Sequence, residues 1–227
     1  KPEAIDRERG VIVEEWRRGQ NAAHRILQKH IPGLLNDSRY AQRLPIGDMD
    51  VVRNAPRSEF VDFYERWYRP DNMAFIAVGD LPTETLAGLT QRFLGDIPRP
   101  ETPLNRPYHF VPFQDDTRVS IATDTEAQRT TVSVYLLDEP APFERVDDYR
   151  TVLTRSLFAS IMNERLRDLA RDTDAPITGA GLGWNRFLRG TEIAAATAVV
   201  RGDRVTESLG LLLREVERAN RFGVSQA

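Results

Sequence analysis

Apolar residues in the N-terminal part of the chain recur about every 3.6 positions, the spacing that puts them on one face of a helix. The pattern predicts a helix over residues 3–31, with apolar positions at Ile5, Val11, Ile12, Trp16, Ala23, Ile26 and Leu27. Gly10 and Gly19 weaken the helix locally. Pro32-Gly33 is expected to end it.

A continuous apolar run at residues 73–80 predicts a short buried strand, because turn residues bound it on both sides. The turn before it is Pro70-Asp71-Asn72. Helices are expected on either side. One covers about 59–67 and is capped by Ser58, and the other covers 82–93.

Residues 98–116 are rich in proline, with Pro98, Pro100, Pro103, Pro107 and Pro112. This density excludes a helix or a central strand and indicates an extended linker. Beyond the linker, two strands are expected at 119–122 and 130–136, followed by a helix over 147–171. Strands at 177–184 and 191–200 and a last helix over about 203–221 complete the pattern. Two α+β units joined by the linker are therefore predicted.

Composition narrows the function classes. The 227 residues carry a net charge of −3, and acidic residues lie among the arginines throughout, so no basic surface for nucleic acid is predicted. The chain has no cysteines, which excludes disulfides, cysteine-ligated zinc and thiol nucleophiles. No apolar run is long enough to span a membrane. The chain opens on Lys1 without an initiator Met, so it is expected to be a piece of a longer protein.

Two glutamates on the first predicted helix are candidates for metal chemistry. Glu8 and Glu15 are seven residues apart, about 700° on a helix, so both project from nearly the same side. Val11 and Ile12 lie between them and are expected to face a core. The alternative is a solvated helix edge. The histidines His24, His30 and His109 form no local metal motif, since the first two face opposite sides of a helix.

The string from Arg7 to Glu15, RERGVIVEE, closely resembles the third-ligand helix of the pitrilysin/insulinase family of zinc metallopeptidases, the inverzincins. In that family a His-x-x-Glu-His helix supplies two histidines and a general base, and a later helix supplies a glutamate. The resemblance implies that Glu15 is the third zinc ligand and that Glu8 is the carboxylate that orients a ligating histidine. Glu14 points about 100° away and is the less favoured ligand. The His-x-x-Glu-His motif is absent and is expected upstream of Lys1.

Further strings resemble the same family in the same order. They are LPIG at 44–47, FYERWYRPDNM at 63–73, FLGDIP at 93–98, TDTEAQ at 123–128 and NERL at 163–166. The resemblance implies α+β repeats in which an antiparallel or mixed sheet packs against helices. Residues 1–97 would be the C-terminal portion of the first, zinc-ligand-bearing repeat, 98–116 the linker, and 117–227 a second, non-catalytic repeat, either whole or truncated.

The function implied is that of a zinc-dependent metalloendopeptidase, which hydrolyses peptides or unfolded proteins with a metal-activated water. The general base would lie upstream, so this chain alone is expected to be inactive and not to bind Zn²⁺ tightly. The rival interpretation is a non-catalytic repeat that serves as a peptide-binding or assembly scaffold. Arg165 is a candidate substrate-binding residue or a surface ion-pair partner. Other repeats of the same chain are expected partners. The location implied is periplasmic or otherwise exported, with the cytoplasm as the alternative.

Overall fold

The computed structural model describes residues 2–224 and divides the chain into two compact units. Unit 1 consists of residues 1–19 and 45–108, and unit 2 consists of residues 20–44 and 109–227. The chain therefore passes between the units at three places, after Gly19, after Leu44 and after Tyr108. Residues 20–44 were expected within the first repeat, but they belong to unit 2, together with the later part of the chain.

Unit 1 is helical. Its elements are α1 (Pro2–Gly19), α4 (Met49–Asn54), α5 (Arg57–Trp67), the 3-10 helix η1 (Pro70–Asn72) and α6 (Thr83–Leu94). The side chain of Asp48 caps α4 by accepting from the backbone N–H groups of Asp50 and Val51. Ser58, expected to cap α5, instead lies inside it, because the helix begins at Arg57, two residues before the predicted start, and its N-cap is Pro56.

The single helix expected over 3–31 is two helices, α1 and α2 (Ala22–Leu34). The break forms because Asn21 has an extended backbone and its side chain accepts from the N–H of His24, which starts a new helix. The expectation that Pro32-Gly33 ends the helix is also wrong, because α2 extends to Leu34. Helix α2 continues through Pro32, and its last turn is stabilised by Ile31 and Leu35, which are both buried.

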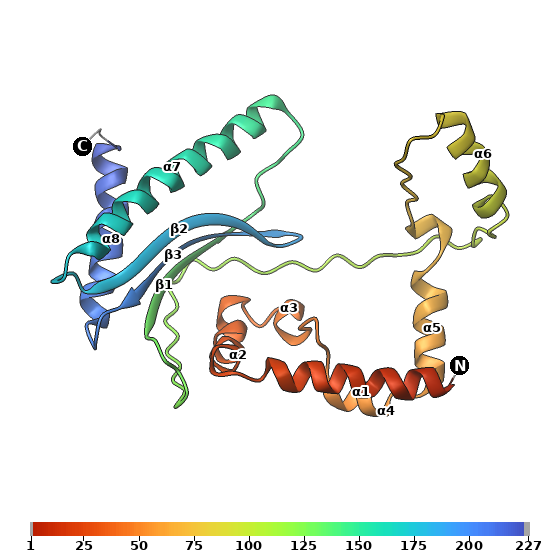
Figure 1. Cartoon of the computed structure of the whole chain (residues 1–227), viewed down its shortest axis with the longest axis horizontal. Coiled ribbons are helices and arrows are strands. Elements are labelled where there is room, and N and C mark those ends of the chain that lie inside the picture. The colour runs from red at the N-terminus through yellow and green to blue at the C-terminus, as the bar shows by residue number, and fades with distance from the viewer. Residues whose placement is uncertain (1, 225–227) are drawn as a thin grey trace. The chain divides into compact units, whose positions relative to one another are not determined.

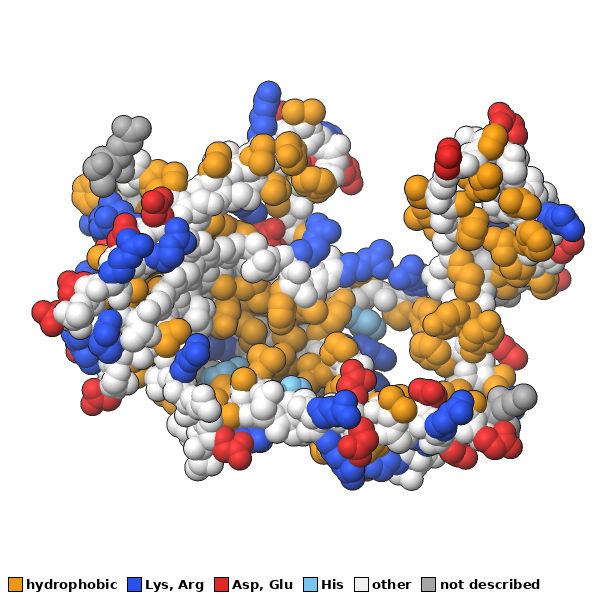
Figure 2. All heavy atoms as spheres, viewed as in Figure 1, with side chains coloured by type: hydrophobic (Ala, Val, Ile, Leu, Met, Phe, Trp, Pro, Cys, Tyr) orange, Lys and Arg blue, Asp and Glu red, His pale blue; other side chains and the backbone are white. Residues whose placement is uncertain are grey.

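The buried strand expected at 73–80 is not formed. Phe75, Ile76 and Val78 are 63%, 82% and 95% exposed, and this segment lies outside any strand. A strand needs a neighbour to satisfy its backbone N–H and C=O groups, and the described part of unit 1 contains helices only. Apolar side chains are accordingly exposed around α6 and the chain that leads into it (Figure 2).

Unit 2 is built on a three-stranded antiparallel sheet in the order β1-β3-β2. The strands are β1 (Thr131–Asp138), β2 (Ile177–Leu188) and β3 (Thr191–Val200). Helix α7 (Val146–Arg171) runs along β2, and α8 (Val205–Phe222) contacts β3 and β1 (Figure 1). The core between helices and sheet contains Leu166, Ala175, Ile177, Ala198, Leu211 and Leu212. The predicted α+β class is thus confirmed.

A second apolar cluster lies where α2 and α3 (Arg39–Gln42) meet the sheet. Ile31, Leu35 and Val111 are buried there, and Leu137 of β1 and Leu188 of β2 pack against them. The strand expected at 119–122 is absent, since Val119 and Ile121 are 83% and 88% exposed and neighbouring residues contact α2 instead. Among residues 2–224, no helix is long and apolar enough to cross a membrane.

Candidate functional site

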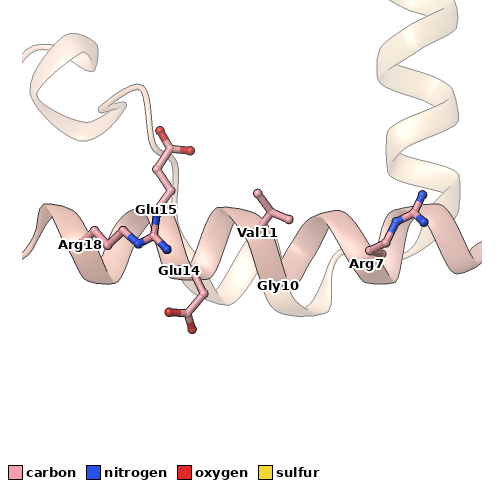
Figure 3. Close-up of a pocket in the computed structure, with 6 residues that line it drawn as sticks. All are labelled: Arg7, Gly10, Val11, Glu14, Glu15 and Arg18. Atoms are coloured by element: carbon pink, nitrogen blue, oxygen red, sulfur yellow. The ribbon is translucent and has the colours of Figure 1, made fainter.

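The two candidate carboxylates lie on α1, and both are exposed. Glu15 lines an open surface hollow whose other residues are Arg7, Gly10, Val11, Glu14 and Arg18. Glu15 and Val11 project from the same side of α1 and Glu14 from the opposite side (Figure 3). Val11 is 56% exposed, so the expectation that it faces a core is wrong, whereas Ile12 is half-buried. Within unit 1, the described residues place no core over the side of α1 that carries Glu15.

Glu14 and Glu15 differ in their partners as well as in direction. The carboxylate of Glu14 accepts from the guanidinium of Arg17, one turn further along α1. Among the described residues, no ion pair or hydrogen bond involves the side chain of Glu15. Its carboxylate is therefore available to a cation without breaking an existing contact, and that of Glu14 is not.

Arg9 anchors the helix that carries these glutamates. Its guanidinium donates to the backbone carbonyls of Val52 and Ala55, at the C-terminal end of α4, and lies over the ring of Phe60 with 5.4 Å to the ring centroid. A cation at a helix C-terminus satisfies carbonyls that have no partner within the helix. This role is not apparent from the sequence. Arg9 lies between Glu8 and Gly10 in the family-like string, but nothing in the sequence identifies its distant partners.

The described residues do not by themselves form a zinc site. Catalytic zinc takes three protein ligands, and among residues 2–224 no group of three or more His, Asp or Glu side chains could hold a metal. All three histidines belong to unit 2. His24 contacts Gln28 at 2.9 Å, and His30 contacts the hydroxyl of Ser120 at 2.6 Å.

Arg165, the candidate substrate-binding residue, forms an ion pair with Glu215 of α8. Burial alone would raise the pKa of Glu215, but hydrogen bonds from Arg165 and Arg218 outweigh it and hold the pKa below its ordinary value. The hydrogen bond that Arg165 donates to Glu215 also raises the pKa of Arg165. This geometry favours the ion-pair alternative, since binding a substrate carboxylate would leave Glu215 with one fewer cation.

The fold and these sequence features match a known family. Residues 54–227 match the model described as the peptidase M16 inactive domain. The chain belongs to the peptidase M16 family, which confirms the resemblance to the pitrilysin/insulinase metallopeptidases.

Particular relatives are zinc proteases. A zinc protease PQQL-like protein of Arabidopsis thaliana is 35% identical over 175 residues, which cover 77% of this chain and 18% of the plant protein. The probable zinc protease PqqL of Escherichia coli is 28% identical over 230 residues, covering 97% of this chain and 24% of that protein. The crystal structure of the first half of the periplasmic protease PqqL from Escherichia coli gives a TM-score of 0.82 at 27% identity, covering 97% of this chain and 47% of that chain. The chain thus spans about a fifth to a quarter of the length of these curated relatives.

Proposed function

We propose that this chain is part of a zinc-dependent metallopeptidase and that Glu15 supplies one ligand to a metal whose other ligands lie outside these residues. The match to the peptidase M16 family and the zinc protease relatives support the activity. The observation that carries the ligand assignment is the contrast on α1: Glu15 is exposed and without a side-chain partner among the described residues, and Glu14 is paired with Arg17. By itself the chain is expected to be inactive.

The later part of the chain is proposed to be the non-catalytic repeat. The description of the matching model as an inactive domain supports this assignment for residues 117–227, which lie wholly inside the match. Residues 1–97 would be the end of the metal-bearing repeat. The match, however, begins at residue 54 and so overlaps the predicted first repeat, and the repeat boundaries stay predictions.

A second candidate function is a peptide-binding or assembly scaffold without metal. Residues 2–224 contain no group of three metal ligands. This absence favours the scaffold only if the longer protein also lacks the two histidines of the His-x-x-Glu-His motif. The substrate proposed in either case is a peptide or an unfolded protein. An exported, periplasmic location is proposed from the periplasmic PqqL structure, with the cytoplasm as the alternative.

Zinc stoichiometry tests the assignment. The protein is prepared as a longer chain extended upstream of Lys1, and zinc is counted in wild type, in Glu15→Gln and in Glu14→Gln. One zinc per chain is expected in the wild type and in Glu14→Gln, and none in Glu15→Gln, because an amide is a neutral and weaker ligand. Glu14→Gln is the matched control, since it changes the neighbouring carboxylate on the other side of α1. If Glu15→Gln retained its zinc, Glu15 would not be a zinc ligand. No zinc in any of the three would support the scaffold.

A further inference from the structure

The Pro-rich linker predicted over 98–116 is not free along its whole length. Residues 109–126, called the strap here, belong to unit 2 and lie against α2 and α3. As residue numbers rise along α2 and α3, the numbers of their partners in the strap fall, so the two segments run antiparallel. The contacts are Arg25 with Asp124 and Glu126, Lys29 with Thr123, His30 with Ser120, Asn36 with Pro112, and Tyr40 with His109.

The two ends of the strap are held by different forces. At the 109–112 end, Val111 is 1% exposed and packs with Ile31 and Leu35. Burial of such an apolar side chain stabilises this end of the strap without any polar contact. At the 117–126 end the large apolar side chains, Val119 and Ile121, are exposed. That end therefore depends on polar contacts.

Arg25 makes most of these polar contacts. Its Nε and Nη2 donate to both oxygens of Asp124 at 2.7 and 2.8 Å, and Nη2 also donates to Glu126 at 2.6 Å. Its Nη1 donates to the carbonyl of Gln20 at 3.1 Å, which ties the pair to the start of α2. The Asp124 side chain is only 10% exposed. A two-point guanidinium–carboxylate pair fixes direction as well as distance, unlike the single contacts of Lys29 and His30.

We propose that Arg25 is the pin that holds the strap against α2 within unit 2, and that breaking the Arg25–Asp124 pair opens the strap at its 117–126 end alone. The Val111 end stays closed, because it does not depend on the pair. Since α2 begins at Ala22 and α1 ends at Gly19, the pinned end is the part of unit 2 that is covalently nearest to the helix carrying Glu15. This inference does not depend on the zinc assignment.

The absence of cysteines allows a direct test, because spin labels attach only where cysteines are introduced. One pair of substitutions, Ala23→Cys and Ala127→Cys, reports on the pinned end. A second pair, Gln42→Cys and Phe110→Cys, reports on the Val111 end. All four positions are exposed. Distance distributions between the labels are measured by pulsed electron paramagnetic resonance in three backgrounds: the unchanged chain, Arg25→Ala, and Arg17→Ala, which breaks an exposed ion pair on α1 as the matched control.

Both label pairs should give one narrow distribution in the unchanged chain and in Arg17→Ala. In Arg25→Ala the first pair should broaden at least twofold and the second should stay narrow. Arg25→Lys should give an intermediate width, because an ammonium cannot make the two-point contact. A broad first distribution in the unchanged chain, or a narrow one in Arg25→Ala, would overturn the proposal. Broadening of both pairs in Arg25→Ala would also overturn it, since Arg25 would then hold more than one end.

Discussion

At the scale of single residues, Asn163 protects the outer edge of the sheet. Its side-chain amide donates to the carbonyl of Leu182 at 3.0 Å and accepts from the N–H of the same residue at 2.7 Å. Leu182 lies on β2, which pairs with β3 and is an edge strand of the sheet formed by residues 2–224. One side chain of α7 thus replaces the hydrogen bonds that a further strand would make, which also blocks pairing with another chain at this point.

Removing this amide should destabilise unit 2. In Asn163→Leu, both backbone groups of Leu182 lose their partner while remaining partly shielded, which should lower the free energy of unfolding by about 1–3 kcal/mol. Urea unfolding followed by circular dichroism measures the change. The matched control is Asn185→Leu, an exposed asparagine on the same strand, for which a change within about 0.5 kcal/mol is expected. Equal effects of the two substitutions would mean that the hydrogen bonds between Asn163 and Leu182 do not contribute to the stability of unit 2.

Glu8 permits a prediction that is separable from that for Glu15. If Glu8 orients a ligating histidine, Glu8→Gln in the longer protein should weaken zinc affinity by about 10- to 100-fold without abolishing binding. Competition with a chelator measures the affinity. An unchanged affinity would make Glu8 a solvated residue of the helix edge, the alternative that its exposure on α1 leaves open.

At the scale of elements, the strap should respond to acid. Arg25 and then the backbone N–H of Glu126 stabilise the carboxylate of Asp124 and hold its pKa well below its usual range. A carboxyl group with a depressed pKa stabilises the closed state fully above its ordinary pKa of about 3.9, and this contribution is lost as the pH falls further. Other charged or titratable groups at this end include Lys29, His30, Arg118 and Glu126.

The first label pair should therefore stay narrow from neutral pH to about pH 4, the ordinary pKa of an aspartate, and broaden progressively only as the pH falls further towards the depressed pKa of Asp124. Asp124→Asn should be broad at every pH, because the amide cannot carry the charge. Circular dichroism checks that β1–β3 remain folded. A transition at the same pH in a chain with Asp124→Asn would exclude Asp124 as its cause.

The elements differ in how well the sequence predicted them. Helix α7, helix α8 and strand β3 lie within two residues of the predicted bounds, because their patterns are long and their partners are inside unit 2. The strand predicted at 73–80 is not formed, because a strand needs a neighbouring strand to pair with, and the apolar pattern alone does not show whether one is present. The break at Asn21 was missed because a local side-chain cap interrupts a periodicity that continues on both sides.

The candidate site shows the same division. Helical geometry predicted that Glu8 and Glu15 project from nearly the same side of α1 and that Glu14 points away. The family resemblance, not geometry, singled out Glu15 as the zinc ligand, and that assignment stays a prediction. It could not identify Arg9 as an anchor or Arg25 as a pin, since Val52 and Asp124 are brought to them only by folding.

At the scale of the whole molecule, the matched family domain and the compact units have different limits. The match begins at residue 54, yet unit 2 includes residues 20–44. A shortened chain that starts at residue 54 should therefore lack the cover over Val111, Leu137 and Leu188. We expect the shortened chain to bind more of a dye that reports exposed apolar surface than the full chain binds. Adding a peptide of residues 20–44 should reduce this extra dye binding, because the peptide would cover the same surface. Equal dye binding by the two chains would mean that α2 and α3 cover nothing that matters to unit 2.

The three passages between the units also set an order of events during synthesis. Helices α2 and α3 leave the ribosome before residues 45–108, which belong to the other unit, and long before β3 ends at Val200. At about 5–20 residues per second, the wait between Leu44 and Val200 is on the order of 10 s. During that interval the sheet that carries Leu137 and Leu188 is incomplete, because its central strand β3 is made last. Ile31 and Leu35 therefore lack part of their apolar cover until β3 has been synthesised.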